Sequence, residues 1–357
     1  MSGSTQQTDS AFDDEAWKDK AALAGELCPR AADLIQRLLY EASIRPHSVT
    51  SRVKSRESAI RKIESKNAGY SLANMTDILG VRITTYFQDE VDTIASLIED
   101  QFEIDRENSA DRRILLDPDR FGYLSLHYIV QLKEPRRSLL EYQRFQQTKF
   151  EIQIRSILQH AWAEIEHDLG YKTKNAVPTD IQRRFSRLAG LLELADTEFV
   201  RIREDLSKHQ QNVRKAVLGS DLDVPIDRDS IIAYIESSPL VQRLDRSIAD
   251  SFELSLRKTS LGGASVLASD MQVIGIKTIH ELDRKLAIDG DKVVSFLQQV
   301  LTKKSKVSKE LSRGAAVRWL GPFEAASLEE DQAKAILETI KFPLAFDIIK
   351  SARRKIK

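Results

Sequence analysis

Residues 149–155 alternate strictly between apolar and polar side chains, and this period of two predicts a β-strand with one buried face. The inward positions are Phe150, Ile152 and Ile154, and the outward positions are Glu151, Gln153 and Arg155. An anion, an amide and a cation held in register on a rigid backbone make an unusual outward face. Taken alone, the stretch is still explained best as a half-buried strand with a solvated charged face.

A second strand with a polar outward face is predicted at residues 122–130. Its inward positions are Leu124, Leu126, Tyr128 and Val130, and its outward positions are Tyr123, Ser125 and His127. A lone histidine more often makes a structural hydrogen bond than it catalyses. A tyrosine that follows Gly122 is suited to stacking on a base, an interaction worth ~1–3 kcal/mol. Two such strands favour a binding site over two solvated surfaces.

A third strand is predicted at residues 81–87, with Arg82 on its outward face. Asp77 stands just before this strand, where it would either cap the turn or hold a cation. A short strand is expected at 102–104, followed by a loop in the charged stretch 106–113. Together these segments predict an α+β fold in which a mixed β-sheet is flanked by helices.

A basic segment at residues 51–63 precedes these strands. Arg52 and Lys54 lie two residues apart, so an extended chain would aim both cations the same way. Ser58 and Lys62 lie four residues apart and would share one face of a helix, with Arg61 beside them. Converging cations of this kind suit a polyphosphate. A solvated basic helix is the alternative.

Apolar spacing predicts helices between and around the strands. One or two helices are expected at 17–44, broken near Pro29 because proline removes a helical hydrogen bond. Another is expected from the end of strand 149–155 to Leu169, and a long charged one from Thr179 to about residue 217.

The helix that ends near Leu169 carries His160, Glu164 and His167 at i, i+4 and i+7. This spacing could ligate a metal, but it is not the His-Glu-x-x-His pattern. A hydrogen-bonded helix surface is therefore favoured over a metal site.

The chain as a whole divides into four predicted parts and a linker. Residues 1–15 are expected to form a loose tail, 16–175 the domain that holds the strands, and 176–219 a connecting helix. Residues 220–225 are interpreted as a linker. Residues 228–357 are expected to form a mostly helical unit with a basic end, which is assigned a binding or regulatory role by elimination.

Composition excludes several other classes of protein. The 357 residues are 41% hydrophobic and 30% charged, with a formal net charge of +0, so no overall field draws the chain to nucleic acid or membrane. Cys28 is the only cysteine, which excludes an internal disulfide and a cysteine-ligated zinc site. No apolar run approaches membrane-spanning length and no signal-type segment is present, so a cytoplasmic protein is expected.

The chemistry suggested by these residues is phosphoryl or pyrophosphoryl transfer. The chain has neither Gly-x-x-x-x-Gly-Lys-Ser/Thr nor Gly-x-Gly-x-x-Gly, so no glycine loop cradles phosphate. Two carboxylates near the ends of neighbouring strands, Asp77 and Glu151, are a usual way to hold Mg²⁺ on a nucleoside triphosphate. Arginine and lysine side chains would then neutralise charge that develops on the phosphoryl oxygens.

Four ordered motifs resemble the synthetase domain of the RelA/SpoT family. They are Arg-x-Lys-x-x-x-Ser-x-x-Arg-Lys, Asp-Ile-x-Gly-x-Arg-Ile, Gly-Tyr-x-Ser-x-His and Glu-Ile-Gln-Ile-Arg, within about residues 45–173. The resemblance implies a nucleotidyltransferase-like fold that moves the β,γ-pyrophosphate of ATP onto the ribose 3′-hydroxyl of GDP or GTP to make (p)ppGpp. Long members of the family place a hydrolase domain before the synthetase, but here only a short helical segment precedes Arg52, so no hydrolase domain and no alarmone hydrolysis are expected.

The resemblance also implies roles for individual residues. Asp77 and Glu151 would hold Mg²⁺, and Glu151 would also help to activate the 3′-hydroxyl. Arg52 and Arg82 would sandwich the adenine of ATP. The residues that hold the ATP phosphates would be Lys54, Ser58, Arg61 and Lys62. Those near the transferred group would be His127, Gln153 and Arg155.

The acceptor is the point at which the chain departs from the family pattern. Tyr123 would stack on the acceptor base, but Arg120 stands in the segment where the familiar Lys-x-Asn is missing. A toxin-type relative that pyrophosphorylates the 3′ end of tRNA, or adenine nucleotides, is thus an alternative to a (p)ppGpp synthetase. A catalytically silent nucleotide-binding regulator is a third possibility. A homo-oligomer formed through the helix from Thr179 or the C-terminal unit is compatible with each.

Overall fold

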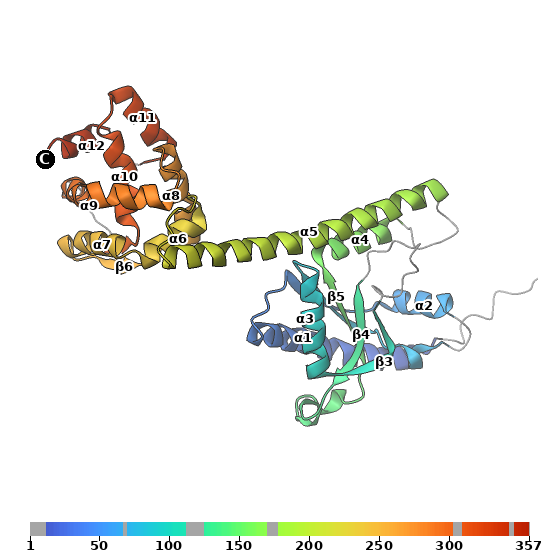
Figure 1. The fold of residues 1–357 in the computed structure, drawn as a ribbon. Coiled ribbons are helices and arrows are strands. Elements are labelled where there is room, and N and C mark those ends of the chain that lie inside the picture. The colour runs from blue at the N-terminus through green and yellow to red at the C-terminus, as the bar shows by residue number, and fades with distance from the viewer. Residues whose placement is uncertain are drawn as a thin grey trace, which may run out of the picture. The chain divides into compact units, whose positions relative to one another are not determined.

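The computed structural model describes residues 12–66, 70–111, 125–169, 178–302, 309–342 and 346–356. The chain divides into two compact units, Met1–Arg203 and Glu204–Lys357, and the boundary between them falls inside helix α5 (Thr179–Leu218). The long helix predicted from Thr179 is therefore present (Figure 1).

The first unit is built on a five-stranded mixed sheet, which confirms the predicted fold class. The strands are β1 (Ser48–Val53), β2 (Leu79–Thr85), β3 (Phe102–Asp111), β4 (Leu126–Leu132) and β5 (Phe150–Ser156). Their order in the sheet is β1-β2-β5-β4-β3. The central strands β2 and β5 are parallel, and every other neighbouring pair is antiparallel.

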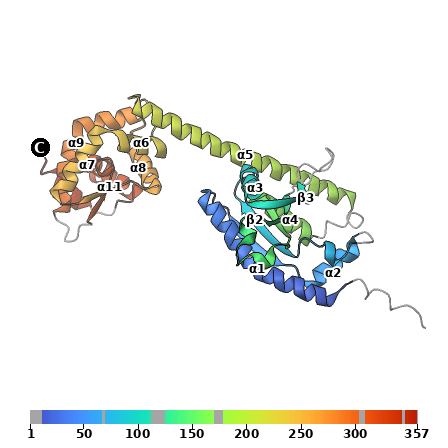
Figure 2. The same cartoon turned by 90° about the horizontal axis from the view of Figure 1, so that it is seen from below.

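Strand register gives the sheet one polar face and one apolar face. On the polar face Gly80 lies opposite both Arg52 and Glu151, and Gln153 lies opposite both Arg82 and His127. On the other face lie the described inward residues predicted from the alternation, which are fully or nearly fully buried, whereas Leu124 lies outside the described residues. That face packs against helices α1 (Asp14–Glu41) and α3 (Asp89–Gln101) (Figures 1 and 2).

Helix α1 runs without a break through Pro29, so the predicted break at this residue is wrong. Leu27 lies before the proline and Ile35 after it, and both are fully buried in the sheet core. The packing of this continuous apolar face outweighs the one hydrogen bond that the proline removes. Helix α2 (Arg56–Ser65) follows β1, and Ser55 caps its first turn.

Strand β3 extends to Asp111, so the loop predicted from residue 106 is wrong over the residues that the structure describes. The strand shifts register between Asp105 and Ala110. The Asp105 carboxylate accepts hydrogen bonds from the backbone and the side chain of Asn108, and its carbonyl accepts from Ser109. This β-bulge lets a charged stretch without regular alternation continue as a strand.

Helix α4 (Ile157–Asp168) begins directly at the end of β5, where Ser156 and Gln159 form a capping box. Trp162 on its inner side packs against Phe185 and Ala189 of α5. The short 3₁₀ turns of this unit are η1 (Leu72–Asn74), η2 (Arg136–Ser138) and η3 (Gln143–Phe145).

The second unit is mostly helical, as predicted. Its helices are α6 (Arg228–Ser237), α7 (Pro239–Ser251), α8 (Leu261–Val273), α9 (Ile279–Leu301), α10 (Ala315–Ala325), α11 (Glu330–Thr339) and α12 (Phe346–Arg353). The unit also contains two short strands, β6 (Ser255–Arg257) and β7 (Glu310–Ser312), which pair in parallel. Phe296 and Phe323 meet edge to face in its own core.

The segment at 220–225 is packed rather than a free linker. The carbonyl oxygens of Leu222 and Val224 accept hydrogen bonds from the backbone of His280 and Ile279, at 2.8 and 2.9 Å. Both side chains also pack against the core of the second unit. Among the described helices, none is long and apolar enough to cross a membrane.

Candidate active site

A cavity of about 200 Å³ opens on the polar face of the sheet, between β1, β2 and β5. Its lining residues are Thr50, Ser51, Arg52, Lys54, Asp77, Gly80, Val81, Arg82, Glu151 and Gln153. Most of the site residues predicted on these strands thus meet at one place. Tyr123 and Arg120 lie outside the described residues, and their assignment to the acceptor stays a prediction.

Glu151 is held as an anion by its neighbours. One carboxylate oxygen lies 2.7 Å from Nδ1 of His127, and the other accepts a hydrogen bond of 2.8 Å from the Gln153 amide. Burial alone would raise the pKa of Glu151, but the hydrogen bond and charge of His127, with help from Gln153 and Lys62, hold it at about 2. Nε2 of His127 lies 2.7 Å from the hydroxyl of Ser125, so the ring is fixed at both ends.

Asp77 faces two lysines and keeps one oxygen without a hydrogen-bond partner. Its Oδ2 lies 2.6 Å from Nζ of Lys62 and 3.1 Å from Nζ of Lys54. Its Oδ1 is buried and has no hydrogen-bond partner among the described residues. Burial lowers the pKa of Lys62, but the hydrogen bond and charge of Asp77 outweigh this and raise it above its usual value. A buried carboxylate oxygen left in this way is a candidate ligand for a cation.

Gly80 leaves the floor of the cavity open. It stands in β2 between Arg52 on β1 and Glu151 on β5. A Cβ atom added at this glycine would meet nothing within 4 Å. The space above the strand is therefore available to a ligand that reaches both the arginine and the carboxylate.

Two arginines converge on one carboxylate beside the cavity. Nη1 of Arg82 lies 3.1 Å and Nη2 of Arg155 3.3 Å from the same oxygen of Glu164 on α4. Burial and the charge of Arg82 lower the pKa of Arg155 to about 10, against the effect of Glu164. Arg155 is only 3% exposed, whereas the Glu164 side chain is 56% exposed. Glu164 is thus the solvent-accessible residue whose negative charge stabilises the adjacent guanidinium groups of Arg82 and Arg155.

Burial and these two arginines also lower the pKa of His160, whose Nδ1 lies 3.6 Å from Glu164. In the described part of the chain, no three histidine, cysteine or acidic side chains are grouped so as to hold a metal.

The remaining predicted phosphate-binding residues, which lie on helix α2, differ in the groups that they contact. Lys62 reaches Asp77, whereas Ser58 accepts a hydrogen bond of 3.2 Å from Arg61 and does not line the cavity. Ser58 also lies 3.0 Å from the hydroxyl of Ser55 at the start of the helix.

Sequence reasoning missed two contributors to the site. Gly80 lies within one of the quoted motifs, but only the strand register shows that it opens the floor between Arg52 and Glu151. Glu164 was recognised only as part of a helix surface. Its contact with Arg82 depends on how α4 folds back over β2, which side-chain spacing alone does not give.

A family model matches the part of the chain that holds this site. Residues 51–176 match the sequence model described as "Region found in RelA / SpoT proteins". These residues form a RelA/SpoT domain. The matched segment begins within β1, extends beyond α4 and includes every described residue that lines the cavity apart from Thr50.

Two relatives of the RelA/SpoT domain are named as enzymes. GTP pyrophosphokinase YwaC of Bacillus subtilis (strain 168) is 29% identical over 160 residues, which cover 44% of this chain and 73% of that protein. GTP pyrophosphokinase YjbM of the same organism is 27% identical over 181 residues, which cover 48% of this chain and 79% of that protein.

Solved structures of small alarmone synthetases also align with this part of the chain. Small alarmone synthetase 1 from Bacillus subtilis aligns with a TM-score of 0.45 and 25% identity, over 55% of this chain and 100% of that one. Small alarmone synthetase 2 aligns with a TM-score of 0.43 and 26% identity, over 53% and 99%.

Proposed function

We propose that the RelA/SpoT domain transfers the β,γ-pyrophosphate of ATP to the ribose 3′-hydroxyl of GDP or GTP. The observation that carries the proposal is the cavity in which Asp77 and Glu151 meet Arg52, Lys54 and Arg82. Paired carboxylates beside clustered cations suit a metal-bound polyphosphate. Two relatives that share the domain bear the name GTP pyrophosphokinase.

In the proposed reaction the acceptor 3′-oxygen attacks the β-phosphorus of ATP. A bond forms between that oxygen and the β-phosphorus, the bond from the β-phosphorus to the oxygen of the α-phosphate breaks, AMP leaves, and the proton of the 3′-hydroxyl is released to water. Lys54 and Lys62 supply positive charge where negative charge grows on the phosphoryl oxygens. Arg52 and Arg82 are proposed to hold the adenine between their guanidinium planes.

Asp77 and Glu151 are the residues proposed to hold Mg²⁺. Both line the cavity, and the buried Oδ1 of Asp77 has no hydrogen-bond partner among the described residues, so the residues present fit a divalent cation. When bound, the ion would neutralise phosphate charge and orient the pyrophosphate. Because Oδ2 of Asp77 contacts the two lysines, its Oδ1 can coordinate such an ion while these contacts are kept.

The low pKa of Glu151 defines its part in the reaction. With a pKa of about 2, the carboxylate is a weak base at neutral pH. It is suited to accept a hydrogen bond from the 3′-hydroxyl and so to orient that group. His127, fixed between Ser125 and Glu151, keeps the carboxylate in place. Gln153 holds the second oxygen, and Arg155 is proposed to act on the transferred group through its charge.

An acceptor screen tests the proposed function. The full chain is incubated with Mg²⁺ and ATP labelled at the γ-phosphate, and with GDP, GTP, AMP, ADP or deacylated tRNA in turn. Label on GDP or GTP supports the proposal. Label on tRNA or an adenine nucleotide would instead support the toxin-type alternative, and no transfer to any acceptor would favour a silent nucleotide-binding regulator. Tyr123→Ala should weaken use of the acceptor while it leaves ATP binding unchanged.

A further inference from the structure

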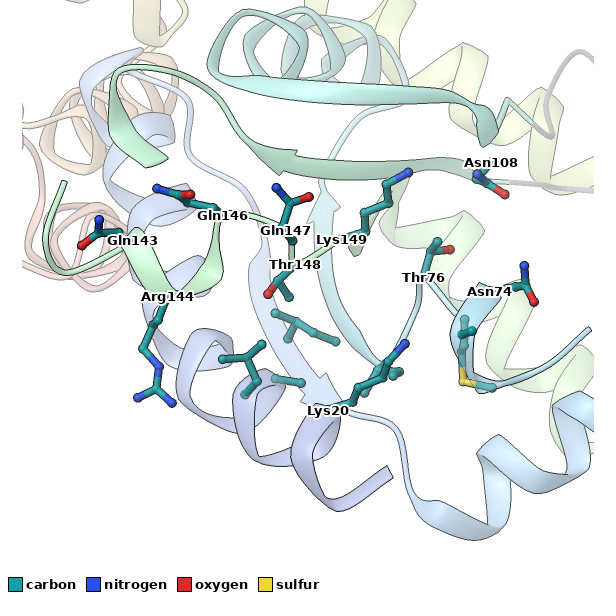
Figure 3. A pocket seen from close by; sticks show the side chains of 16 residues that line it. Lys20, Asn74, Thr76, Asn108, Gln143, Arg144, Gln146, Gln147, Thr148 and Lys149 are labelled. Atoms are coloured by element: carbon teal, nitrogen blue, oxygen red, sulfur yellow. The ribbon is translucent and has the colours of Figure 1, made fainter. Parts of the chain in front are cut away.

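A second, larger cavity of about 620 Å³ lies in the first unit and shares no lining residue with the candidate active site (Figure 3). Four segments build it: helix α1, the stretch at 73–79, strand β3 and the stretch at 143–149. Its volume is within the range of pockets that hold small molecules, about 300–1,000 Å³. Nothing in the proposed reaction uses this cavity.

The lining of this cavity is positively charged. Lys20, Arg144 and Lys149 line it, and none of the described residues that line it is acidic. Asp105 and Glu26 outside the lining pair with Lys149 and Arg144, at 2.6 and 2.5 Å. Nζ of Lys20 donates to a neutral partner, the carbonyl oxygen of Leu72, at 2.9 Å. Among the described residues no carboxylate pairs with Lys20, so its charge is left for an anion to compensate.

The rest of the lining would hold the body of a small molecule. Carboxamides and hydroxyls such as those of Asn74, Thr76 and Gln147 surround the space in Figure 3. The aliphatic side chains of Leu23 and Ile78 supply an apolar floor. A few polar groups placed over an apolar floor are typical of small-ligand sites.

The cavity shares two chain segments with the candidate active site. Thr76 and Ile78 line it, while Asp77 between them lines the catalytic cavity. Lys149 lines it as well, two residues before Glu151 of the catalytic cavity. A molecule bound here would therefore contact the backbone segments that carry both proposed metal-binding carboxylates.

We propose that this cavity is a second binding site, for a small organic anion with an apolar body. Lysine and arginine side chains together with amide and hydroxyl donors recognise a phosphate ester or a carboxylate alike. Both classes of ligand share an anionic group beside an apolar part. The proposal stands on the cavity alone and holds whether or not the chain transfers pyrophosphate.

Titration with model anions tests the site on the full chain. Phenyl phosphate and benzoate are titrated in separate arms of a ligand-detected NMR experiment, and benzyl alcohol serves as the neutral control. We expect at least one anion to bind and the alcohol to bind more weakly. The arm with the lower dissociation constant identifies the anionic group that the site prefers.

Two variants locate the bound anion. Lys20→Gln keeps a hydrogen-bond donor for Leu72 but removes the charge, and we expect it to weaken binding about tenfold, since a charge-assisted hydrogen bond contributes about that much. Arg144→Gln, at an exposed position, should weaken binding in the same direction without a risk to folding. Lys18→Gln is the matched control, because Lys18 lies on the same helix, is exposed and does not line the cavity.

Weaker binding in Lys20→Gln and Arg144→Gln, with binding unchanged in Lys18→Gln, supports the proposal. Binding that is equal in all four proteins would place the anion elsewhere, including the catalytic cavity, and would overturn it. Absence of binding by both anions would overturn it as well.

Discussion

At the scale of single residues, Glu164 illustrates how a site depends on a group outside it. Its carboxylate lies within 3.1 Å of Arg82 and 3.3 Å of Arg155, two like charges that would otherwise repel each other. It is proposed to position Arg82 for ATP. An ion pair with one exposed partner is worth about 0.2–1 kcal/mol, so the effect of its loss should be modest.

Glu164→Gln tests this positioning role. Without the negative charge, we expect Arg82 to move away from Arg155 and the KM for ATP to rise about twofold to fivefold, which corresponds to that energy range. The kcat should change little. Glu193→Gln on α5 is the control, since Glu193 is exposed and does not line the cavity. A fall in kcat with an unchanged KM would contradict the role.

Asp196 is the residue whose titration should be visible in the stability of the fold. It lies on α5, is 1% exposed, and accepts a hydrogen bond of 2.5 Å from the hydroxyl of Ser156 at the start of α4. Burial raises the pKa of Asp196 to about 7. Because the folded-state pKa lies above the unfolded one, the folded chain binds the extra proton between the two pKa values. Stability is therefore lost as pH rises through 7.

We expect the free energy of unfolding to fall by about 1 kcal/mol between pH 6 and pH 8 on account of Asp196. Asp196→Asn cannot ionise, so this part of the pH dependence should disappear. Urea unfolding of both proteins at the two pH values provides the comparison. The same slope in the variant as in the parent would show that Asp196 is not the group that titrates.

At the scale of secondary-structure elements, strand β2 leaves room for a ligand because Gly80 has no side chain. Gly80→Val introduces a β-branched side chain that suits a strand, and its Cβ atom would meet no neighbour within 4 Å. The protein should fold with unchanged thermal stability. The added methyl groups would occupy the floor between Arg52 and Glu151, so we expect the KM for ATP to rise about tenfold or more. Unchanged ATP use by the folded variant would mean that the nucleotide lies elsewhere.

The sequence predicts secondary-structure elements well where apolar and polar side chains alternate. It predicts them poorly where contacts with residues distant in the chain determine the structure. Strand β5 and its two faces follow from the alternation of Phe150, Ile152 and Ile154. Helix α1 continues through Pro29 because its apolar face packs on the sheet, and this depends on residues far away in the chain. Strand β3 continues beyond Asp105 because a bulge absorbs its irregular pattern.

The candidate site shows the same division. Its carboxylates and cations are recognisable from motifs, because chemistry restricts which residue types can serve. The geometry of these residues cannot be predicted from the motifs. Lys54 and Lys62 both approach one oxygen of Asp77 because β1 and α2 are placed around β2. The partnership of Glu164 with Arg82 likewise requires α4 to be in position.

At the scale of the whole molecule, the residues of the candidate site that the structure describes all belong to the unit Met1–Arg203. The unit Glu204–Lys357 has a hydrophobic core of its own. Leu188, Leu191 and Leu194 of α5 are 52%, 61% and 56% exposed, and association of copies through this helix stays a prediction.

A shortened chain tests whether the first unit is sufficient. We expect a protein that ends at residue 207 to fold and to keep measurable transfer, because the described site lies before that point. Circular dichroism checks the fold and the labelled-ATP assay checks the activity. A rise above the activity of the full chain would identify the second unit as a restraint, whereas a folded but inactive protein would contradict the expectation.

The most direct test of the central claim is the stoichiometry of the products formed from ATP and a guanine nucleotide. The full chain is incubated with Mg²⁺, ATP and GDP or GTP, and ³¹P NMR follows the nucleotides. Pyrophosphate transfer predicts one AMP for each guanine nucleotide that gains two phosphates at its 3′ position. Glu151→Gln should slow this by ~10²–10³ or more, while Glu103→Gln, an exposed strand residue outside the site, should not. Formation of ADP with free phosphate, or equal rates in the Glu151 variant and its parent, would contradict the account.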